Sequence, residues 1–212
     1  MLDVKSTSKG FLPPRMTTAQ RDLISSPATG LTIYNTSKNC YETYNGSSWV
    51  SNTHYIGESY GGGIVFYIYD NGQHGLIAAI ADQSTGIRWY GGSSTNTRAR
   101  ADGVGAGLKN TSIIIANQST VDGNAFAATV CNEYSVTVGG VTYGDWYLPS
   151  KYELNLLFMQ KAVVGGFANN NYWSSSEYNA LSLYAWYQGF DGGTQWILIK
   201  SSTNYVRAVR AF

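Results

Sequence analysis

The sequence predicts an α+β fold in which a small β-rich segment, residues 1–56, precedes a larger domain, residues 57–212. Three observations lead to this prediction. Short strands separated by turn residues fill the first 50 residues, a strand pair opens the second part, and helical periodicity is confined to the middle of the chain. A chain of 212 residues is long enough for one medium domain with an appendage.

The first segment combines one helical turn with short strands. Thr17 is placed to cap a helix over residues 18–24, and strands are predicted at 31–34, 41–44 and 49–50. Two hairpins and one helical turn cannot enclose a core of their own. We therefore expect this segment to associate with copies of itself.

The larger domain follows a linker at residues 51–58 and opens with a hairpin whose strands are predicted at 64–69 and 75–80. Helical spacing of Leu108, Ser112 and Ile115 marks the first of its helices. Helices are expected at 104–118, at 124–134, and at 150–163, where Ser150 and Glu153 form a capping box. Strands are expected near 172–175, 185–190, 195–200 and 205–212. The final strand should return beside the first strand of this domain.

Composition excludes several classes of partner. Charged residues make up 13% of the chain, about half of the usual share, and 14 basic residues nearly balance 13 acidic ones. Without a basic excess, nucleic acid is not expected as a partner. No apolar run approaches the roughly 18 residues of a membrane span, so membrane insertion is not expected either.

The sequence offers little for catalysis. His54 and His74 have no neighbouring carboxylate or thiol in sequence, and Ser174-Ser175-Ser176 lacks the glycines of a nucleophile elbow. A carboxylate pair such as Asp145 with Glu177 stays open, because folding brings distant residues together. We expect no enzyme and no catalytic residues.

Metal and cofactor motifs are also missing from the sequence. Cys40 and Cys131 are too few and too far apart for a zinc cluster, although a disulfide between them stays open. No stretch has the spacing of a calcium loop. The glycine-rich stretch 102–107 opens a helix without a surrounding strand-helix-strand unit, so it is interpreted as a flexible helix start. No metal and no cofactor are expected.

Residues 162–206 carry the strongest functional signal. Their only charges are Glu177, Asp191 and Lys200, and aromatic residues alternate with Ser, Gly and Asn, a composition typical of antibody-like binding surfaces. We expect three of the aromatic residues to belong to the core: Trp173, Trp186 and Phe190. The run 196–199, Trp-Ile-Leu-Ile, does not alternate as a strand with one wet face should.

Four blocks of sequence, in order, then resemble a known family. They are Trp146-Tyr147-Leu148-Pro149-Ser150, Glu153-Leu154, Tyr172-Trp173-Ser174-Ser175-Ser176-Glu177, and Val206-Arg207-Ala208-Val209-Arg210-Ala211-Phe212. They resemble the collagen-like-adhesin C-terminal (Lcl) domain family, which implies a C-type-lectin-like fold for residues 57–212. Residues 9–50 resemble a repeat of phage tail fibres and bacterial surface proteins, which implies a trimerisation segment. The calcium ligands of sugar-binding lectins and the paired cysteines of formylglycine-generating oxidases have no counterpart here.

Related domains include the variable proteins of diversity-generating retroelements, in which AAY codons become NNY. Such codons cannot encode Trp, Gln or Lys, so five residues between 179 and 203 would be fixed: Trp186, Gln188, Gln195, Trp196 and Lys200. The candidate ligand-binding residues are Leu181, Leu183, Tyr184, Tyr187, Gly189, Asp191, Thr194, Trp196, Ile197, Leu198, Ile199, Ser201 and Ser202.

The function expected from these observations is that of a receptor-binding protein or adhesin with a variable aromatic surface, diversified by a retroelement. The alternative is a fixed bacterial surface adhesin for a glycan or a protein. The expected partners are a protein or glycan on a target cell and two further copies of the chain in a homotrimer. The expected location is a virion tail fibre tip or a bacterial cell surface.

Overall fold

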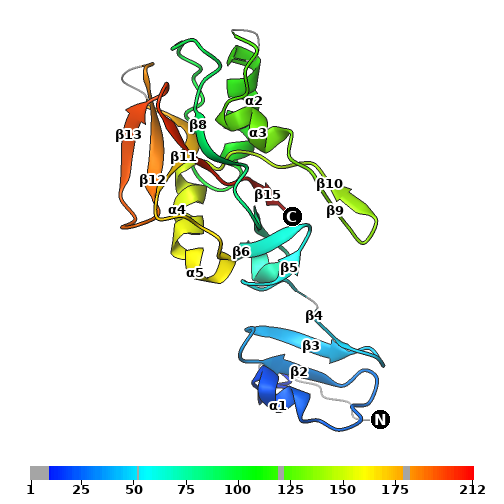
Figure 1. Ribbon diagram of the computed structural model, residues 1–212. Helices are drawn as coiled ribbons and strands as arrows, with labels where there is room; N and C mark the ends of the chain where they lie inside the picture. Colours follow the sequence, from blue (N-terminus) through cyan, green and yellow to red (C-terminus); the bar gives the residue numbers. More distant parts are fainter. Residues whose placement is uncertain (1–9, 52, 119–121, 179–181) are drawn as a thin grey trace. The chain divides into compact units, whose positions relative to one another are not determined.

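The computed structural model describes residues 10–51, 53–118, 122–178 and 182–212 (Figure 1). The chain divides into two compact units, Met1–Tyr55 with Asp70–Gln73, and Ile56–Tyr69 with His74–Phe212. Helices and strands occur in both units, as the α+β prediction requires. Among the helices within these ranges, none is both long enough and apolar enough to cross a membrane.

The first unit is a four-stranded sheet with one short helix. Its elements are β1 (Arg15–Met16), α1 (Thr18–Asp22), β2 (Thr32–Asn35), β3 (Cys40–Tyr44) and β4 (Trp49–Ser51). The strand order is β1-β2-β3-β4, with β1 parallel to β2 and the other pairs antiparallel. Thr17 caps α1 as predicted, because its hydroxyl accepts a hydrogen bond from the Gln20 amide and the Gln20 side chain accepts one from the Thr17 amide.

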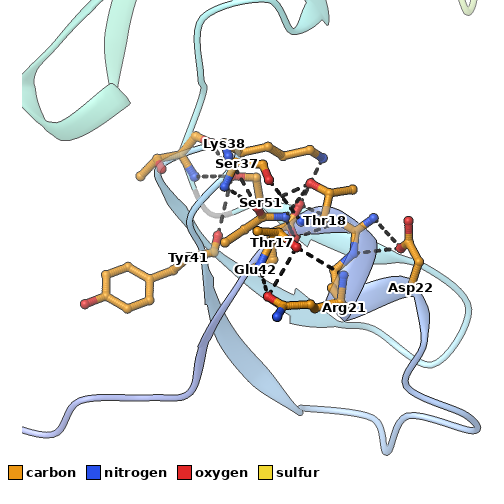
Figure 2. Close-up of polar contacts among 12 residues, drawn as sticks. Thr17, Thr18, Arg21, Asp22, Ser37, Lys38, Tyr41, Glu42 and Ser51 are labelled. Carbon is orange, nitrogen blue, oxygen red and sulfur yellow. Dashed lines mark hydrogen bonds and ion pairs between the residues drawn. The ribbon is translucent and has the colours of Figure 1, made fainter.

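A polar network lies at the centre of this unit (Figure 2). The Glu42 side chain is 1% exposed and accepts hydrogen bonds from Arg21 Nη1 (2.7 Å), Lys38 Nζ (2.9 Å) and Asn35 Nδ2 (2.8 Å). Burial opposes ionisation of Glu42, but the hydrogen bonds from these three residues outweigh it, and the pKa of Glu42 is lowered. The helix α1 buries no residue, so this network rather than an apolar core holds α1 on the sheet.

We predict that this network makes the first unit sensitive to acid. The pKa of Glu42 is lower in the folded state than its unfolded value of about 4.3, so its contribution to stability is complete above that value and is lost as the pH falls through the folded pKa. Glu42→Gln should lower the free energy of unfolding by about 3 kcal/mol at pH 7, because Arg21 and Lys38 lose their shared partner. Hydrogen exchange of peptides from residues 32–51 measures this change.

The matched control is Asp22→Asn, since the Asp22 carboxylate is mostly exposed and also contacts Arg21. This variant should cost less than about 1 kcal/mol. Equal protection in the two variants would contradict the assignment of stability to the Glu42 network.

The described residues of the second unit form three sheets and four α-helices. Its elements are β5 (Ser59–Tyr60), β6 (Gly63–Tyr69), β7 (His74–Ala79), β8 (Ser84–Arg88), α2 (Ala106–Gln118), α3 (Ala127–Asn132), β9 (Val136–Val138), β10 (Val141–Tyr143), α4 (Lys151–Met159), α5 (Lys161–Val164), β11 (Asn171–Glu177), β12 (Tyr184–Gly189), β13 (Gln195–Ile199), β14 (Thr203–Val206) and β15 (Val209–Ala211). The sheet orders are β13-β12-β11-β14-β8, β15-β7-β6-β5 and β10-β9. The short 3-10 helix η1 (Asp70–Gly72) follows β6 in the chain and belongs to the first unit.

The five-stranded sheet has an apolar cluster on each face. Consecutive residues of a strand point to opposite faces, and the neighbours Tyr172 and Trp173 of β11 belong to different clusters. Trp173 packs with Trp89 and with residues of α2 and α3. Tyr172 packs with Phe190 and with the leucines of α4. Both faces of the sheet are therefore packed against other residues near β11, and the exposed part of the sheet lies toward its β13 edge.

The predicted final strand, residues 205–212, is wrong as a single element. It divides into β14 and β15, which belong to different sheets. The division occurs at Arg207, whose buried guanidinium donates to Asp82 Oδ1 (2.7 Å) and to the carbonyls of Ala79 and Gly166. In addition, β15 pairs with β7 and not with β6, the first long strand, beside which it was predicted to lie.

The helix predictions need two further corrections. The residues Leu108 and Ser112 lie on the exposed side of α2, whose buried face is largely polar. This face is polar because Asn110 bonds to Ala101 and Thr111 bonds to both backbone groups of Leu148. The predicted helix 150–163 breaks at Gln160 into α4 and α5. Five further strands were not predicted from the sequence: β1, β5, β8, β9 and β10.

Candidate ligand-binding surface

The hairpin of β12 and β13 lies at one end of the five-stranded sheet (orange and red in Figure 1). Its antiparallel register pairs Tyr184 with Ile199, and Gln188 with Gln195. Within the described part of the chain no strand pairs with the outer edge of β13. The candidate residues predicted from the sequence therefore gather on a sheet edge.

The register explains the run of apolar residues at 196–199. The side chains of Trp196 and Leu198 point to the face that carries Trp173, while Ile197 and Ile199 point to the opposite face. Leu198 packs against the core on its face. Trp196, nearer the end of the hairpin, is 62% exposed, and Ile199 is 39% exposed. The missing alternation thus belongs to an edge strand that presents apolar side chains on both faces.

The structure brings most of the candidate residues together along residues 183–202, with different exposures. Those exposed are Leu183, Asp191, Thr194, Trp196, Ile199 and Ser201. Those half-buried are Tyr184, Tyr187, Ile197, Leu198 and Ser202. Gly189 is buried, and Leu181 lies outside the described residues.

A buried ion pair fixes the base of this hairpin. The Lys200 side chain is fully buried, and its Nζ donates to Glu177 Oε1 (2.5 Å) and to the carbonyl of Thr95 (3.1 Å). Glu177 also accepts hydrogen bonds from the backbone amides of Thr97 and Arg98 (2.9 Å each). Burial lowers the pKa of Lys200, against the raising effect of Glu177. The end of β11, the end of β13 and the 95–98 loop are thereby joined at one point.

Three more residues that NNY codons cannot encode bind to the scaffold. The buried Gln188 donates through Nε2 to the Gly193 carbonyl (2.5 Å), and Gln195 donates to the Lys151 carbonyl (2.8 Å). The ring of Trp186 lies 4.5 Å from Lys151 Nζ. Trp186 is half-buried, so its prediction as a core residue is wrong, whereas that for Trp173 and Phe190 is confirmed.

A polar pocket of about 390 Å³ adjoins Trp186. It is lined by Arg100, Asp102, Lys151, Ser176, Glu177, Tyr178 and Trp186. Lys151 lies 3.6 Å from Asp102, and Arg100 lies 3.7 Å from Glu177, so both cations are held by long contacts. The pocket can therefore offer cationic donors beside an aromatic wall. The pocket was not predicted from the sequence, because its residues come from segments about 50 and 25 residues apart and no local pattern joins them.

The glycine-rich stretch at 102–107 has a definite partner, which corrects its interpretation as a flexible helix start. The amides of Gly105 and Gly107 donate to the carboxylate of Glu153 (2.7 and 3.1 Å), which also accepts from the Ser150 amide. A Cβ atom on Gly107 would lie 2.4 Å from Glu153 Oε2. Burial raises the pKa of Glu153, while its hydrogen bonds oppose this shift. The anion at the start of α2 is thus the protein's own carboxylate.

The structure does not bring together the residues considered for catalysis, a disulfide or a metal site. Asp145 pairs with Arg210 (2.6 Å) and Glu177 with Lys200, so each carboxylate of the open acid/base pair has its own cation. Cys40 and Cys131 form no disulfide with each other. No group of three or more His, Cys, Asp or Glu residues that could hold a metal ion occurs in the described ranges.

We predict that Lys200→Met lowers the free energy of unfolding of the second unit by about 3 kcal/mol or more, because Glu177 is left buried without its cation. Urea unfolding at pH 7 followed by circular dichroism measures the change. The control is Lys109→Met at an exposed position of α2, for which the change should stay within about 0.5 kcal/mol. Similar midpoints for the two variants would show that the ion pair does not stabilise the unit.

Two family models match the chain. Residues 78–210 match the model described as the Lcl C-terminal domain, and residues 1–75 match the model described as the phage tail like trimerisation region. Both resemblances drawn from the sequence are confirmed by these matches. A comparison with curated proteins gave no match.

Proposed function

The chain belongs to the Lcl C-terminal domain family, and from this premise we propose that it is a trimeric receptor-binding protein or adhesin. In this proposal the second unit, with a C-type-lectin-like fold, binds its ligand through the β12–β13 hairpin and the pocket beside Trp186. The observation that carries the proposal is the exposed indole of Trp196 beside other exposed apolar residues on a sheet edge whose base is held by a buried ion pair. Exposed aromatic groups on a rigid support are typical of binding hot spots.

The two family matches are consistent with a trimeric binding protein. Both fit a surface or adhesin-type protein, and the trimerisation region supports a homotrimer. Exposed apolar side chains of the first unit offer contacts between copies, since Leu23 is 82% exposed and Phe11 is 72% exposed. Three linked heads would bind a repetitive cell surface with an avidity that exceeds the affinity of a single head.

Binding, not catalysis, is the activity we propose. The carboxylates that could act as acid or base are engaged with Arg210 and Lys200. The partner would be a protein or glycan on a target cell, and the location a virion tail fibre tip or a bacterial surface. A fixed adhesin for one glycan or one protein is the second candidate, since aromatic surfaces contact either class of ligand.

We further propose that a retroelement diversifies the exposed positions of the β12–β13 hairpin. Four of the five residues that NNY codons cannot encode contact the scaffold: Trp186, Gln188, Gln195 and Lys200. The exposed positions around them, including Leu183, Thr194 and Ile199, hold residues that such codons can encode. The residues that NNY codons cannot encode thus mostly hold the hairpin in place, while the residues that these codons can encode are exposed. This difference supports a surface whose exposed residues vary.

The proposed binding surface makes a direct prediction. The double variant Trp196→Ser with Ile199→Ser should lose about 30-fold or more in affinity, because two exposed contacts of the hairpin are removed. The full chain is titrated onto intact bacterial cells and onto an array of immobilised glycans, and affinity is measured on whichever probe the wild type retains. Leu108→Ser, an exposed apolar position of α2, is the matched control. Unchanged binding by the double variant would contradict the proposed surface.

A second prediction concerns the codons for residues 175–212 in the source population. If the surface is diversified, deep sequencing should find variation confined to NNY codons, with Trp186, Gln188, Trp196 and Lys200 unchanged. A uniform sequence would remove the diversification proposal and leave the fixed adhesin.

A further inference from the structure

The hairpin of β9 and β10 forms a two-stranded sheet that extends away from the rest of the second unit (Figure 1). Its register pairs Val138 with Val141, and Thr137 with Thr142. Because side chains alternate along a strand, one face of the hairpin is apolar and the opposite face carries the two threonines, whose hydroxyls lie 2.8 Å apart. The hairpin is therefore amphipathic.

Only the base of this apolar face is covered. Val136 packs against the core, and the guanidinium of Arg210 lies 4.7 Å from the ring of Tyr143. Toward the tip, Val138 is 54% exposed and Val141 is 53% exposed. An isolated two-stranded hairpin is marginally stable in water, so a projecting hairpin with an apolar tip needs cover for that tip.

The apolar face continues into a groove of about 320 Å³ at the foot of the hairpin. Its lining includes Tyr60, Gly62, Ile80, Val136, Val138 and Tyr143. Close packing at its floor requires glycine, because a Cβ atom on Gly62 would lie 2.3 Å from Val136 Cγ1. We call the exposed apolar residues of this region, Tyr60, Ile80, Val138 and Val141, the hairpin patch.

We propose that the hairpin patch of each head packs against a neighbouring head of the same homotrimer. This inference rests on the trimer of the proposed function. The trimerisation match lies in the same chain, so three copies of the second unit are held at an effective concentration on the order of millimolar. At that concentration a second copy is the apolar surface most available to the patch. The contacts in a cyclic trimer are heterologous, so the hairpin patch of one head meets a different surface of the next head.

Cysteine cross-linking of the full chain tests the contact. Val138→Cys places a thiol on the apolar face, and Thr137→Cys places one on the opposite face of the same strand. Both are treated with a short bismaleimide, beside the wild type, whose two cysteines are buried. We expect Val138→Cys to link separate chains at least about tenfold more than Thr137→Cys, with a yield independent of dilution because the chains are already held together.

Light scattering on the same samples separates this inference from the trimer itself. A trimer in which the two cysteine variants link chains equally, or not at all, would overturn the hairpin contact and leave the trimer intact. A monomeric protein would overturn the trimer and the contact together.

Discussion

The contact between Lys200 and Glu177 is the interaction on which the exposed hairpin depends. Burying two charges costs free energy, and close contact with additional hydrogen bonds must offset that cost. Here the Thr95 carbonyl accepts from the ammonium, and two backbone amides of the 95–98 loop donate to the carboxylate. The pair thereby fixes the base of the hairpin from inside, so that the side chains displayed on its edge do not need to stabilise the fold.

The same arrangement recurs elsewhere in the chain. Three of its five glutamates are buried: Glu42, Glu153 and Glu177. Their carboxylates form hydrogen bonds that join separate segments of the chain inside the fold. Glu42 joins a helix to a sheet, and Glu153 joins the starts of α2 and α4. Each accepts at least three hydrogen bonds, as a buried carboxylate requires. Buried polar connections of this kind hold together segments that apolar packing alone would position less specifically.

Local chemistry predicted much of the fold, and long-range contacts determined the rest. The capping residues Thr17 and Ser150 act within one turn of chain, so the sequence alone located both helix starts. The division of the last strand at Arg207 depends on Asp82, 125 residues away, and no local pattern indicates it. The pocket beside Trp186 was missed for the same reason, because Arg100 and Lys151 meet there only in the folded chain. Composition also pointed to the segment that holds the candidate hairpin, since the shortage of charge in residues 162–206 is itself a local property.

Trp196 occupies a special position in the proposed function. Among the five residues that NNY codons cannot encode, it alone is more than half exposed. If the surface is diversified as proposed, an exposed residue that its codons cannot change would make the same contact in every variant. A tryptophan suits that role, because its large rigid ring gives contact area at low cost in side-chain entropy. In the proposed function the indole would supply a constant share of the affinity, and Leu183, Thr194 and Ile199 would determine which ligand is bound.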